Sequence, residues 1–589
     1  MNYNDRLNCL IKRYFPYENI NSNLDIINEI GKIIEENKSN NFAIWGSGEH
    51  TENLHKYFSS EIKDAQCIID NNKALAGSKF LGFNTIKPDD IHEYNLDTIF
   101  ISSYGGREDI KRQAEQLVQN CNIIDFYEKL EEKGIEINGV FYIYESTYIE
   151  LYDFVYKYKN SCNRLEKQLY LKKIIVLYLK IRDIYNAKKF IKTYIEERFE
   201  DKNIFETLLL EIESLVIDLS NKLRSRKGND ILLLFLDSLR AKDVFDNNSV
   251  MKYTNKILDN SKYFTNAFAS SIFTYESVPS MFIGKLPFCD GIYKRKLAGE
   301  NEVLFIKRAI DEGYTIKIFT ADFWKIIDGN NIQYGQYSNF MTTNFWNAIC
   351  DLAQNENEKT IYLLYFLQEI HPPHICGYST IKPIVHNTPF ACNDDIKQTQ
   401  EQYNIQYRDC LKYVDTQLEF YFNILGDYIT KVLFSDHGQI IENAMSELNN
   451  IGTLAGWHDE RYHVPLILNG DKVKHSKYDD MFSMIHLNDV IVSLMDNKEY
   501  INNEKYVEVN FSKICNDTIR KNYLKAGYED YIHGFRVLRD DKYKLVITGN
   551  GKYKAYILPE QLKECKDENI KKMIIDNFKK STDVSVPKI

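Results

Sequence analysis

Short apolar runs alternate with amphipathic stretches over the first part of the chain. FAIWG, CIID, TIFISS and NIIDF have the length of buried strands, whereas TENLHKYF and EDIKRQAEQLV have the apolar spacing of helices. Strands that alternate with helices predict a parallel sheet, because parallel neighbours need a crossover connection. We therefore expect a small Rossmann-like α/β domain over residues 1–140.

A second region, residues 141–228, has a helical pattern almost throughout. LEKQLYLKKIIVLYLKIRDIYNAKKFIKTYIEERF and ETLLLEIESLVIDLSNKL place apolar residues three or four positions apart and contain neither Gly nor Pro. The pattern predicts helices that form a spacer or a packing layer. SRKGND then marks the boundary to the next region, since Gly and polar residues end helices.

The third region, residues 229–589, returns to apolar runs of strand length. These runs are ILLLFLD, TIKIFTA, TIYLLYFLQEI, TKVLFSD and VPLILN, and most are separated by helical or loop stretches. Uninterrupted apolar strands are typical of a parallel sheet with helices on both faces, so we expect a large α/β domain. Towards the end, GFRVLRDDKYKLVITGNGKYKAYIL predicts antiparallel strands joined by a turn at GNG.

Composition and charge argue against some classes of function. The 589 residues carry a formal net charge of -10, which argues against a dedicated nucleic-acid binder. No apolar run reaches the roughly 18 residues of a membrane helix, and the first residues lack the apolar core of a signal peptide. The 11 cysteines are an odd number without CxxC spacing, which favours reduced thiols. We expect a cytoplasmic protein, with the surface of the inner membrane as an alternative location.

Candidate ligand residues follow the predicted strands of the third region. Asp237 ends ILLLFLD, the pair Asp436 and His437 ends TKVLFSDH, and His371 follows TIYLLYFLQEI. Ligands of open parallel sheets bind at the carboxyl ends of strands, so these side chains should meet at one edge. Carboxylate with imidazole suits zinc or manganese. A salt-bridged core pair is the alternative for Asp436 and His437, because buried charges are normally paired.

Thr274 precedes a Pro-Ser turn in SSIFTYESVPSMFIGKLP. We expect that turn to open an apolar helix whose free N–H groups can face an anion. A threonine just before it could bind the metal, lose its proton and attack phosphorus. The alternative is that Ser277 or Ser280 only caps the helix.

Five segments in this order resemble the motif series of the alkaline phosphatase and sulfatase superfamily. They are FLDSLRAKD, FTYESVPSMFIGKLP, EIHPPH, FSDHG and HVPLIL. The series looks most like lipid A phosphoethanolamine transferases, lipoteichoic acid synthases and related phosphoglycerol transferases. The resemblance implies an alkaline-phosphatase-like fold and one or two divalent ions. Zinc or manganese is favoured, with magnesium or calcium as alternatives.

The resemblance also assigns roles to individual residues. Thr274 matches the nucleophile, and His371 matches a histidine that contacts the transferred group or a second metal. The metal ligands would be Asp237, Thr274, Asp436, His437 and, from GWHDERYHVPLIL, His458 with His463 as the other candidate. Candidates for binding substrate are Arg240, Lys285 and His374.

Departures from the family pattern change the expected chemistry. Sulfatases carry Cys-x-Pro-Ser-Arg, whereas here Ser277 stands at the cysteine position and Met281 at the arginine position. We therefore expect phosphorus chemistry rather than sulfate-ester hydrolysis. A cytoplasmic enzyme would use a soluble activated donor, such as a CDP-linked alcohol, and would transfer its phosphoryl-linked group to a bacterial surface glycan or its precursor. A phosphodiesterase and a non-catalytic glycan-binding module are the alternatives, and the oligomeric state is open.

The first region carries its own candidate site. FAIWGSGEHTENL places Gly46 and Gly48 between a strand and a helix, and Asp70 ends the next strand. These residues resemble a dinucleotide-binding fingerprint in which Thr51 replaces the third glycine. Nucleotide binding, a structural role and sugar docking are the alternatives. The segment is also similar to small domains of bacterial surface-polysaccharide proteins.

Overall fold

The computed structural model describes residues 2–16, 24–72, 75–133, 135, 146–295, 297–320, 326–336, 338–383, 396–441, 456–501, 504–514, 520–521, 523–524, 527–561 and 563–586. The chain forms two compact units. The smaller unit is built mainly from Tyr17–Ile149, and the larger unit combines Met1–Pro16 with Glu150–Ile384 and Thr388–Ile589. Each unit is described by itself below.

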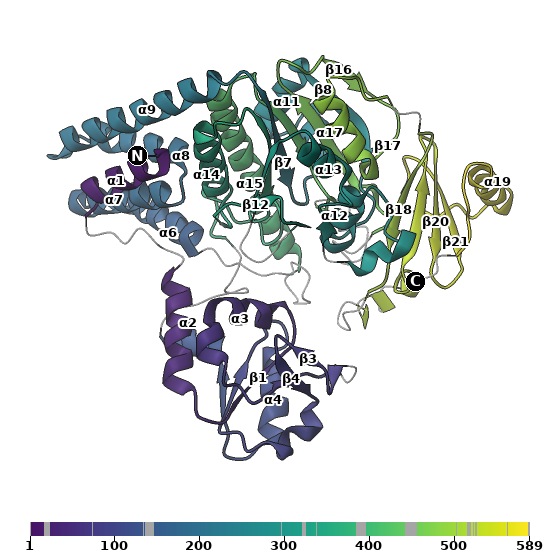
Figure 1. Ribbon diagram of the computed structural model, residues 1–589, viewed down its shortest axis with the longest axis horizontal. Helices are drawn as coiled ribbons and strands as arrows, with labels where there is room; N and C mark the ends of the chain where they lie inside the picture. The colour runs from purple at the N-terminus through teal and green to yellow at the C-terminus, as the bar shows by residue number, and fades with distance from the viewer. Residues whose placement is uncertain are drawn as a thin grey trace. The chain divides into compact units, whose positions relative to one another are not determined.

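The smaller unit is a Rossmann-like α/β domain, as predicted (Figure 1). Its sheet has the order β3-β4-β2-β1-β5-β6, and all neighbours are parallel except β3 and β4. The strands are β1 (Phe42–Trp45), β2 (Ile68–Ile69), β3 (Lys79–Phe80), β4 (Phe83–Ile86), β5 (Thr98–Ile101) and β6 (Asn122–Asp125). The helices are α2 (Leu24–Asn37), α3 (Glu49–Ile62), η2 (Pro88–Glu93), α4 (Arg107–Leu117) and α5 (Phe126–Glu132).

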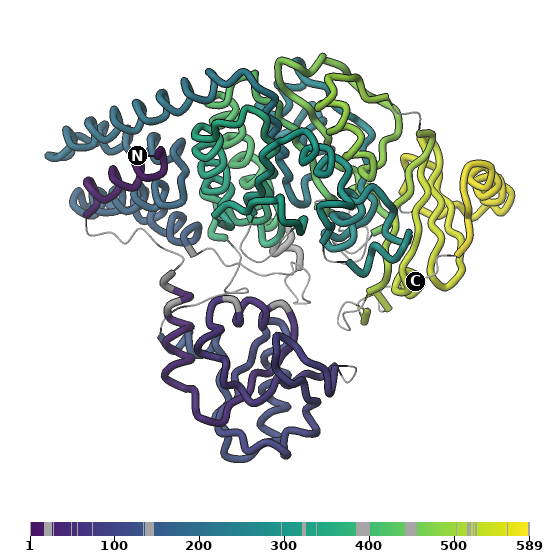
Figure 2. Tube along the Cα trace, in the orientation of Figure 1, coloured from purple at the N-terminus to yellow at the C-terminus, as the bar shows by residue number. Residues whose placement is uncertain are grey.

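The first helix of the chain, α1 (Tyr3–Tyr14), belongs to the larger unit and not to the Rossmann-like unit. It lies along α9 (Lys202–Arg224; Figure 2), where Arg6 and Arg13 form ion pairs with Asp218 and Glu211. The expected domain 1–140 therefore differs from the compact unit, which begins at Tyr17. Sequence periodicity could not show this, because an amphipathic helix does not reveal which partner its apolar face will meet.

The predicted helical region forms α6 (Ser146–Asn160), α7 (Arg164–Lys180), α8 (Ile184–Glu196) and α9 (Lys202–Arg224). It is a packing layer of the larger unit rather than a detached spacer. The buried carboxylate of Asp183 accepts hydrogen bonds from Tyr413 Oη at 2.8 Å and Gln417 Nε2 at 2.9 Å, both on α15 (Ile396–Leu425). These bonds fix the helical layer to the α/β part of the unit.

The central sheet of the larger unit has the order β12-β10-β13-β7-β14-β15-β8-β16, and β17 also pairs with β8. The strands from β12 to β14 are parallel, while β15 runs antiparallel to β14 and β8. Their bounds are β7 (Asn229–Leu236), β8 (Ser261–Phe268), β10 (Thr315–Phe319), β12 (Ile332–Tyr334), β13 (Lys359–Phe366), β14 (Thr430–Phe434), β15 (His463–Asn469), β16 (Ser476–Tyr478) and β17 (Phe482–Ser483).

Helices cover both faces of this sheet, as predicted (Figure 1). Residues Ile231, Leu233 and Phe235 of β7 share one core with α12 (Thr274–Ile283), α13 (Leu304–Asp311) and α17 (Leu487–Met495). The other face packs on α14 (Met341–Gln354) and α15 (Ile396–Leu425), where Phe345 stacks on Phe366. Burial of both faces explains the unbroken apolar runs of β7 and β13.

Short elements connect the main ones: α10 (Ala241–Phe245), α11 (Lys252–Ile257), η3 (Leu258–Asn260), η4 (Cys289–Lys294), η6 (Asp459–Arg461), η7 (Met484–His486) and η8 (Glu529–Tyr531). A two-stranded ribbon pairs β9 (Ala298–Gly299) with β11 (Ile327–Asp328). The carboxyl-terminal part is the predicted antiparallel sheet, β18 (Val507–Phe511), β19 (Phe535–Arg539), β20 (Tyr543–Thr548) and β21 (Tyr553–Ile557), followed by α19 (Glu568–Lys579).

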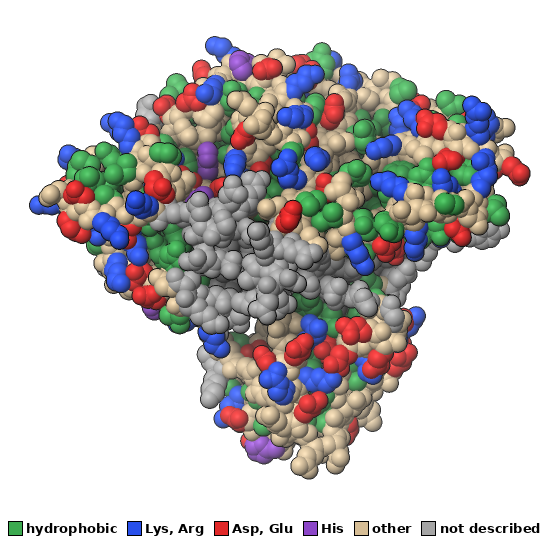
Figure 3. All heavy atoms as spheres, turned by 180° about the vertical axis from the view of Figure 1, so that it is seen from behind, with side chains coloured by type: hydrophobic (Ala, Val, Ile, Leu, Met, Phe, Trp, Pro, Cys, Tyr) green, Lys and Arg blue, Asp and Glu red, His purple; other side chains and the backbone are tan. Residues whose placement is uncertain are grey.

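Among the described helices, none combines the length and the apolar character needed to cross a membrane. On the face drawn in Figure 3, basic and acidic side chains are interspersed over the described surface. Such mixing gives little long-range attraction for a polyanion, because neighbouring opposite charges cancel at a distance.

Candidate active site

Two buried carboxylates and a histidine meet at the carboxyl edge of the central sheet. Asp237 follows β7, while Asp436 and His437 follow the neighbouring strand β14. One ligand atom from each lies within 4.8 Å of the other two, and all three residues are buried. In the described part of the chain no other group of three such residues is placed this closely. The expected convergence at one sheet edge is therefore present.

Neighbouring groups orient these carboxylates. Asp237 accepts hydrogen bonds from Tyr365 Oη at 2.6 Å and from Ser238 Oγ at 2.8 Å. The Ser238 N–H donates to Asp436 Oδ1 at 3.3 Å. The second oxygen, Asp436 Oδ2, is buried without a hydrogen-bond partner among the described residues. A buried acceptor without a donor is costly, so this oxygen is suited to a cation.

His437 presents a lone pair to the same space. Its Nδ1 lies 2.9 Å from the carbonyl oxygen of Gly438, so Nδ1 carries the proton and Nε2 does not. The Thr274 hydroxyl lies 3.0 Å from His437 Nε2 and 3.4 Å from Asp237 Oδ2. The Thr274 hydroxyl therefore lies beside Asp237 and His437, as the sequence predicts.

The electrostatics of this group also fit a divalent cation. Burial and the charge of Asp237 raise the pKa of Asp436 well above its usual range, and burial lowers the pKa of His437 to about 3. Two adjacent buried carboxylates repel each other when no positive charge lies between them. Asp237, Thr274, Asp436 and His437 together offer oxygen atoms and one imidazole nitrogen, a set suited to a divalent cation.

Arg461 is a further residue beside the site that sequence reasoning missed. Its buried guanidinium donates through Nη2 to the carbonyl oxygen of Ile272 and packs 5.6 Å from the centre of the Phe273 ring. Its charge acts on Asp436 and Asp237, and its Nε has no hydrogen-bond partner in the described part of the chain. The only sequence signal was an arginine in the segment before β15. An arginine alone does not indicate a position beside the site until the fold is known.

The helix at Thr274 begins earlier than the sequence suggested. Thr274 is the first residue of α12, and Pro279 lies inside that helix rather than at its start. Ser277 Oγ donates to the carbonyl oxygen of Asp436 at 2.6 Å, and Ser280 Oγ donates to that of Lys285, so neither serine caps the helix. Ser277 thus connects α12 to the strand end that carries Asp436, which leaves Thr274 as the hydroxyl facing the acids.

His371 and His374 have different surroundings although they are close in sequence. His371 is partly buried, and its Nδ1 lies 2.8 Å from the Pro372 carbonyl oxygen, which leaves Nε2 with the lone pair. In its protonated form His371 would lower the pKa of His437, so the two rings lie within range of each other's charge. His374 is buried with Nδ1 2.7 Å from the Ile370 carbonyl oxygen, and burial lowers its pKa to about 3. We therefore assign His374 a packing role.

The two later histidines are not brought into the ligand group. His458 Nδ1 accepts the Glu460 N–H at 3.3 Å and thereby begins η6. His463 lies in β15 with Nε2 2.7 Å from the Thr265 carbonyl oxygen, and it stacks on Phe268. Neither ring lies in the group of Asp237, Asp436 and His437, and a role for either histidine as a metal ligand stays a prediction.

Arg240 and Lys285 are engaged in ion pairs. The buried guanidinium of Arg240 binds both carboxylate oxygens of Asp243 and also Glu460 at 2.8 Å. Lys285 is exposed and pairs with Asp290 at 2.7 Å. The geometry therefore favours structural roles for both over a role in binding phosphate oxygens.

In the smaller unit, Gly46 has φ +125° and a Cβ there would lie 2.6 Å from the Ser102 carbonyl oxygen, so the turn requires glycine. Asp70 accepts hydrogen bonds from the Ser47 N–H at 2.8 Å and Ser47 Oγ at 2.6 Å. Gly48 is exposed before α3. These contacts account for Gly46 and Asp70 by local structure, and a nucleotide at this turn stays a prediction.

Comparison with known proteins identifies two segments. Residues 229–498 match the sulfatase family, and residues 38–124 match a family described as C2185-like, N-terminal. No protein of curated function matches the chain. The matched larger segment, less than half of the chain, is similar to the sulfatase family of the alkaline phosphatase-like superfamily.

Solved structures similar to the chain cover 60% of it. The phosphonate monoester hydrolase of Agrobacterium radiobacter is 14% identical, with 94% of that protein covered and a TM-score of 0.45. The phosphonate monoester hydrolase of Silicibacter pomeroyi is 11% identical, with 94% covered and a TM-score of 0.45. BT1596, a 2-O GAG sulfatase, is 14% identical, with 90% covered and a TM-score of 0.43.

Proposed function

We propose that the sulfatase-family domain transfers a phosphoryl-linked group, such as phosphoethanolamine or phosphoglycerol, to a hydroxyl of a bacterial surface glycan or its precursor. A covalent intermediate on Thr274 would carry the group. One observation supports this most directly: the Thr274 hydroxyl points at the unprotonated His437 Nε2 beside Asp237, at the amino end of α12. A hydroxyl in these surroundings is suited to act as a nucleophile.

A divalent cation held by Asp237, Asp436, His437 and Thr274 would supply positive charge that favours ionisation of the threonine hydroxyl and neutralises phosphoryl oxygens. Thr274 Oγ1 then forms a bond to phosphorus while the bond from phosphorus to the leaving group breaks, and the threonine proton passes to water. The Arg461 guanidinium and the amino end of α12 add positive potential where negative charge develops.

The second step returns the enzyme to its starting state. The acceptor hydroxyl forms a bond to phosphorus, the bond from phosphorus to Thr274 Oγ1 breaks, and the threonine oxygen regains a proton. His371 is our candidate to take the acceptor proton, because its Nδ1–H faces Pro372 and its Nε2 is left with the lone pair. With water as acceptor, the same two steps hydrolyse a phosphodiester.

Hydrolysis is the second candidate function, and the match of residues 229–498 to the sulfatase family favours it. Ser277 and Met281 at the cysteine and arginine positions argue against sulfate esters as substrates. For the transfer reaction we propose a soluble, CDP-linked donor and a reaction in the cytoplasm. The donor follows from the proposed compartment, in which lipid-linked donors outside the cell are not accessible.

The test is intact-mass spectrometry of the full chain after incubation with CDP-ethanolamine or CDP-glycerol and zinc, manganese or magnesium. We expect an added phosphoethanolamine or phosphoglycerol that peptide mapping places on Thr274, and no adduct on Thr274→Ala. Ser277→Ala is the matched control, since this hydroxyl lies three residues further along α12 and donates to the backbone carbonyl of Asp436 rather than to an acid side chain. Consumption of donor without acceptor supports hydrolysis. Absence of an adduct and of turnover with every metal would overturn both enzymatic proposals.

Arg461 can be tested by two substitutions. Arg461→Lys keeps the charge and should retain more activity than Arg461→Met, for which we expect a loss of about 100-fold, similar to removal of one oxyanion donor. A purely structural role would instead lower the activity of both variants in proportion to their loss of folded protein, which circular dichroism measures.

A further inference from the structure

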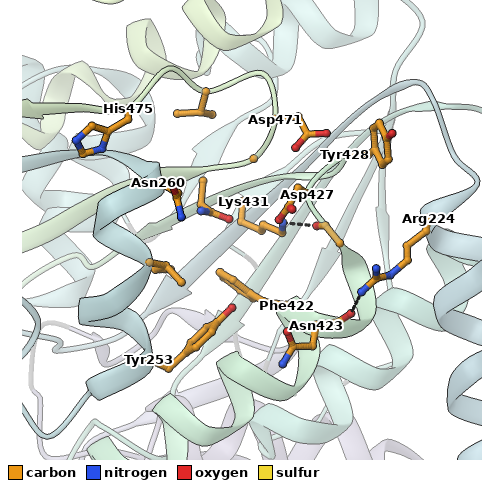
Figure 4. A pocket seen from close by; sticks show the side chains of 15 residues that line it. Arg224, Tyr253, Asn260, Phe422, Asn423, Asp427, Tyr428, Lys431, Asp471 and His475 are labelled. Atoms are coloured by element: carbon orange, nitrogen blue, oxygen red, sulfur yellow. Dashed lines mark hydrogen bonds between the residues drawn. The ribbon is translucent and has the colours of Figure 1, made fainter.

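A cleft of about 700 Å³ opens at the opposite edge of the central sheet (Figure 4). Lys431, at the start of β14, lies at its floor, and the acid group follows the other end of the same strand. Five residues of strand separate Lys431 from Asp436, or about 17 Å. The cleft is therefore distinct from the candidate active site, and its volume lies within the usual range for small-molecule sites.

The cations of this cleft are already used by the protein. Lys431 Nζ donates to the carbonyl oxygen of Gly426, and Arg224 Nη2 donates to that of Asn423, as the dashed lines in Figure 4 show. Both bonds satisfy free carbonyl groups at the carboxyl end of α15. The charges of two carboxylates of the cleft, Asp427 and Asp471, act on Lys431. A cleft with committed and balanced cations is a poor site for a phosphate or a nucleotide.

Other polar groups of the cleft are free to bind a ligand. Within the described part of the chain, the side chains of Asn260, Asn423, Asp427 and Asp471 make no hydrogen bond to protein. His475 Nδ1 faces the Ser261 carbonyl oxygen at 2.9 Å, which leaves its Nε2 with a lone pair. The cleft thus offers amide donors together with amide, carboxylate and imidazole acceptors.

An aromatic wall stands beside these polar groups. Tyr253 and Phe422 pack edge to face, with ring centres 6.0 Å apart and an interplanar angle of 82°, and Tyr428 lies at the rim. A ligand that fits must combine an apolar face for the rings with many hydroxyls that both donate and accept. A neutral sugar has this combination, whereas an acyl chain would leave the polar groups unpaired.

We propose that this cleft binds a neutral sugar residue of a glycan. The inference does not depend on chemistry at Thr274, because the cleft lies at the other edge of the sheet. In a glycan-modifying enzyme, a second sugar site would hold the polymer while the active site acts elsewhere along it, and it would raise the effective concentration of the acceptor.

The test is saturation-transfer NMR on the full chain with glucose, galactose, N-acetylglucosamine, N-acetylgalactosamine, cellobiose and N,N′-diacetylchitobiose. We expect transfer to at least one sugar, and a drop of at least 10-fold in its affinity for the double variant Asn260→Ala/Asp471→Asn. These exposed side chains make no hydrogen bond to any residue that the structure describes, so the variant should melt at the same temperature as the wild type. Asp259→Ala is the matched control, because Asp259 is the exposed neighbour of Asn260 outside the cleft.

Thr274→Ala should bind the sugar as well as the wild type, which separates this proposal from the proposed reaction. No transfer from any of the six sugars, or transfer that the double variant does not weaken, would overturn the proposal. Binding of inorganic phosphate or CMP that the double variant weakens, without sugar binding, would also overturn it, because the cleft would then recognise an anion.

Discussion

Two groups of buried acids in the larger unit differ in how their charge is neutralised. Asp459 is surrounded by protein cations: Arg539 Nε lies 2.9 Å away, Lys544 Nζ 3.2 Å, and Tyr462 Oη 2.6 Å. Asp237 and Asp436 are equally buried, yet no lysine or arginine forms an ion pair with either among the described residues. The first group therefore has its counter-charges within the protein, and the second group does not.

The pKa values of the two groups differ in the direction that this difference in ion pairing predicts. Burial alone would raise the pKa of Asp459, but the charges of Lys544 and Arg539 hold it well below its usual range. Burial and the Asp237 charge raise the pKa of Asp436 well above that range. A buried carboxylate that is paired with cationic side chains of the protein contributes to stability. A buried carboxylate without such a partner requires a bound ion to neutralise its charge.

The largest expected effect is on activity. Asp436→Asn should lower kcat/KM for the phosphodiester substrate by about 10⁴-fold, or about 5.5 kcal/mol, because an amide cannot supply the negative charge that holds the cation. The free energy of unfolding of the metal-free variant should not fall, since the amide oxygen can still accept the Ser238 N–H. Steady-state kinetics and urea unfolding measure the two quantities. Unchanged activity would remove Asp436 from the active site.

The second effect is on stability. Lys544→Met should lower the free energy of unfolding by about 3–5 kcal/mol, because the buried Asp459 loses one of its two cations. Urea unfolding measures the loss, and Lys542→Met, an exposed neighbour in the same hairpin, is the control. A loss below that of the control would show that the ion-paired group is not needed for stability.

Metal binding should have the third-largest effect. Zinc or manganese at 100 times its dissociation constant should raise the free energy of unfolding by about 2.7 kcal/mol, because only the folded chain brings the ligands together. Asp436→Asn should lose this gain, and Lys542→Met should keep it. Thermal melting with and without EDTA measures the shift, and an equal shift for Asp436→Asn would move the binding site elsewhere.

The smallest effect is a pH dependence with opposite sign in the two groups. The raised pKa of Asp436 means that its contribution to metal-free stability is present below about pH 4 and is lost as pH rises through the folded pKa, by up to about 1.4 kcal/mol per pH unit. The lowered pKa of Asp459 stabilises the fold above about pH 4, and this is lost as pH falls further. The difference in the free energy of unfolding between wild type and Asp436→Asn should therefore change between pH 4 and 8. The same difference between wild type and Asp459→Asn should stay nearly constant from pH 6 to 8. Equal slopes would contradict the comparison.

The sequence predicted that the groups at strand ends would meet. Asp237, Asp436 and His437 follow apolar runs that form adjacent parallel strands, so their meeting followed from the topology that the runs predicted. The sequence could not show where His458 and His463 lie relative to this group, because their ring directions depend on η6 and on the antiparallel strand β15. It also missed Arg461, since a buried cation has no sequence signature until the fold shows which residues surround it.

The sequence by itself determined the fold class of both units and the residues that meet at one sheet edge, because periodicity and strand order are local properties of the chain. Only the tertiary structure decided where α1 packs, which hydroxyl of the α12 segment faces the acids, and which buried carboxylates find a cation within the protein. These outcomes depend on contacts between residues far apart in the chain, where direction and distance, and not residue type, decide whether a charge is paired.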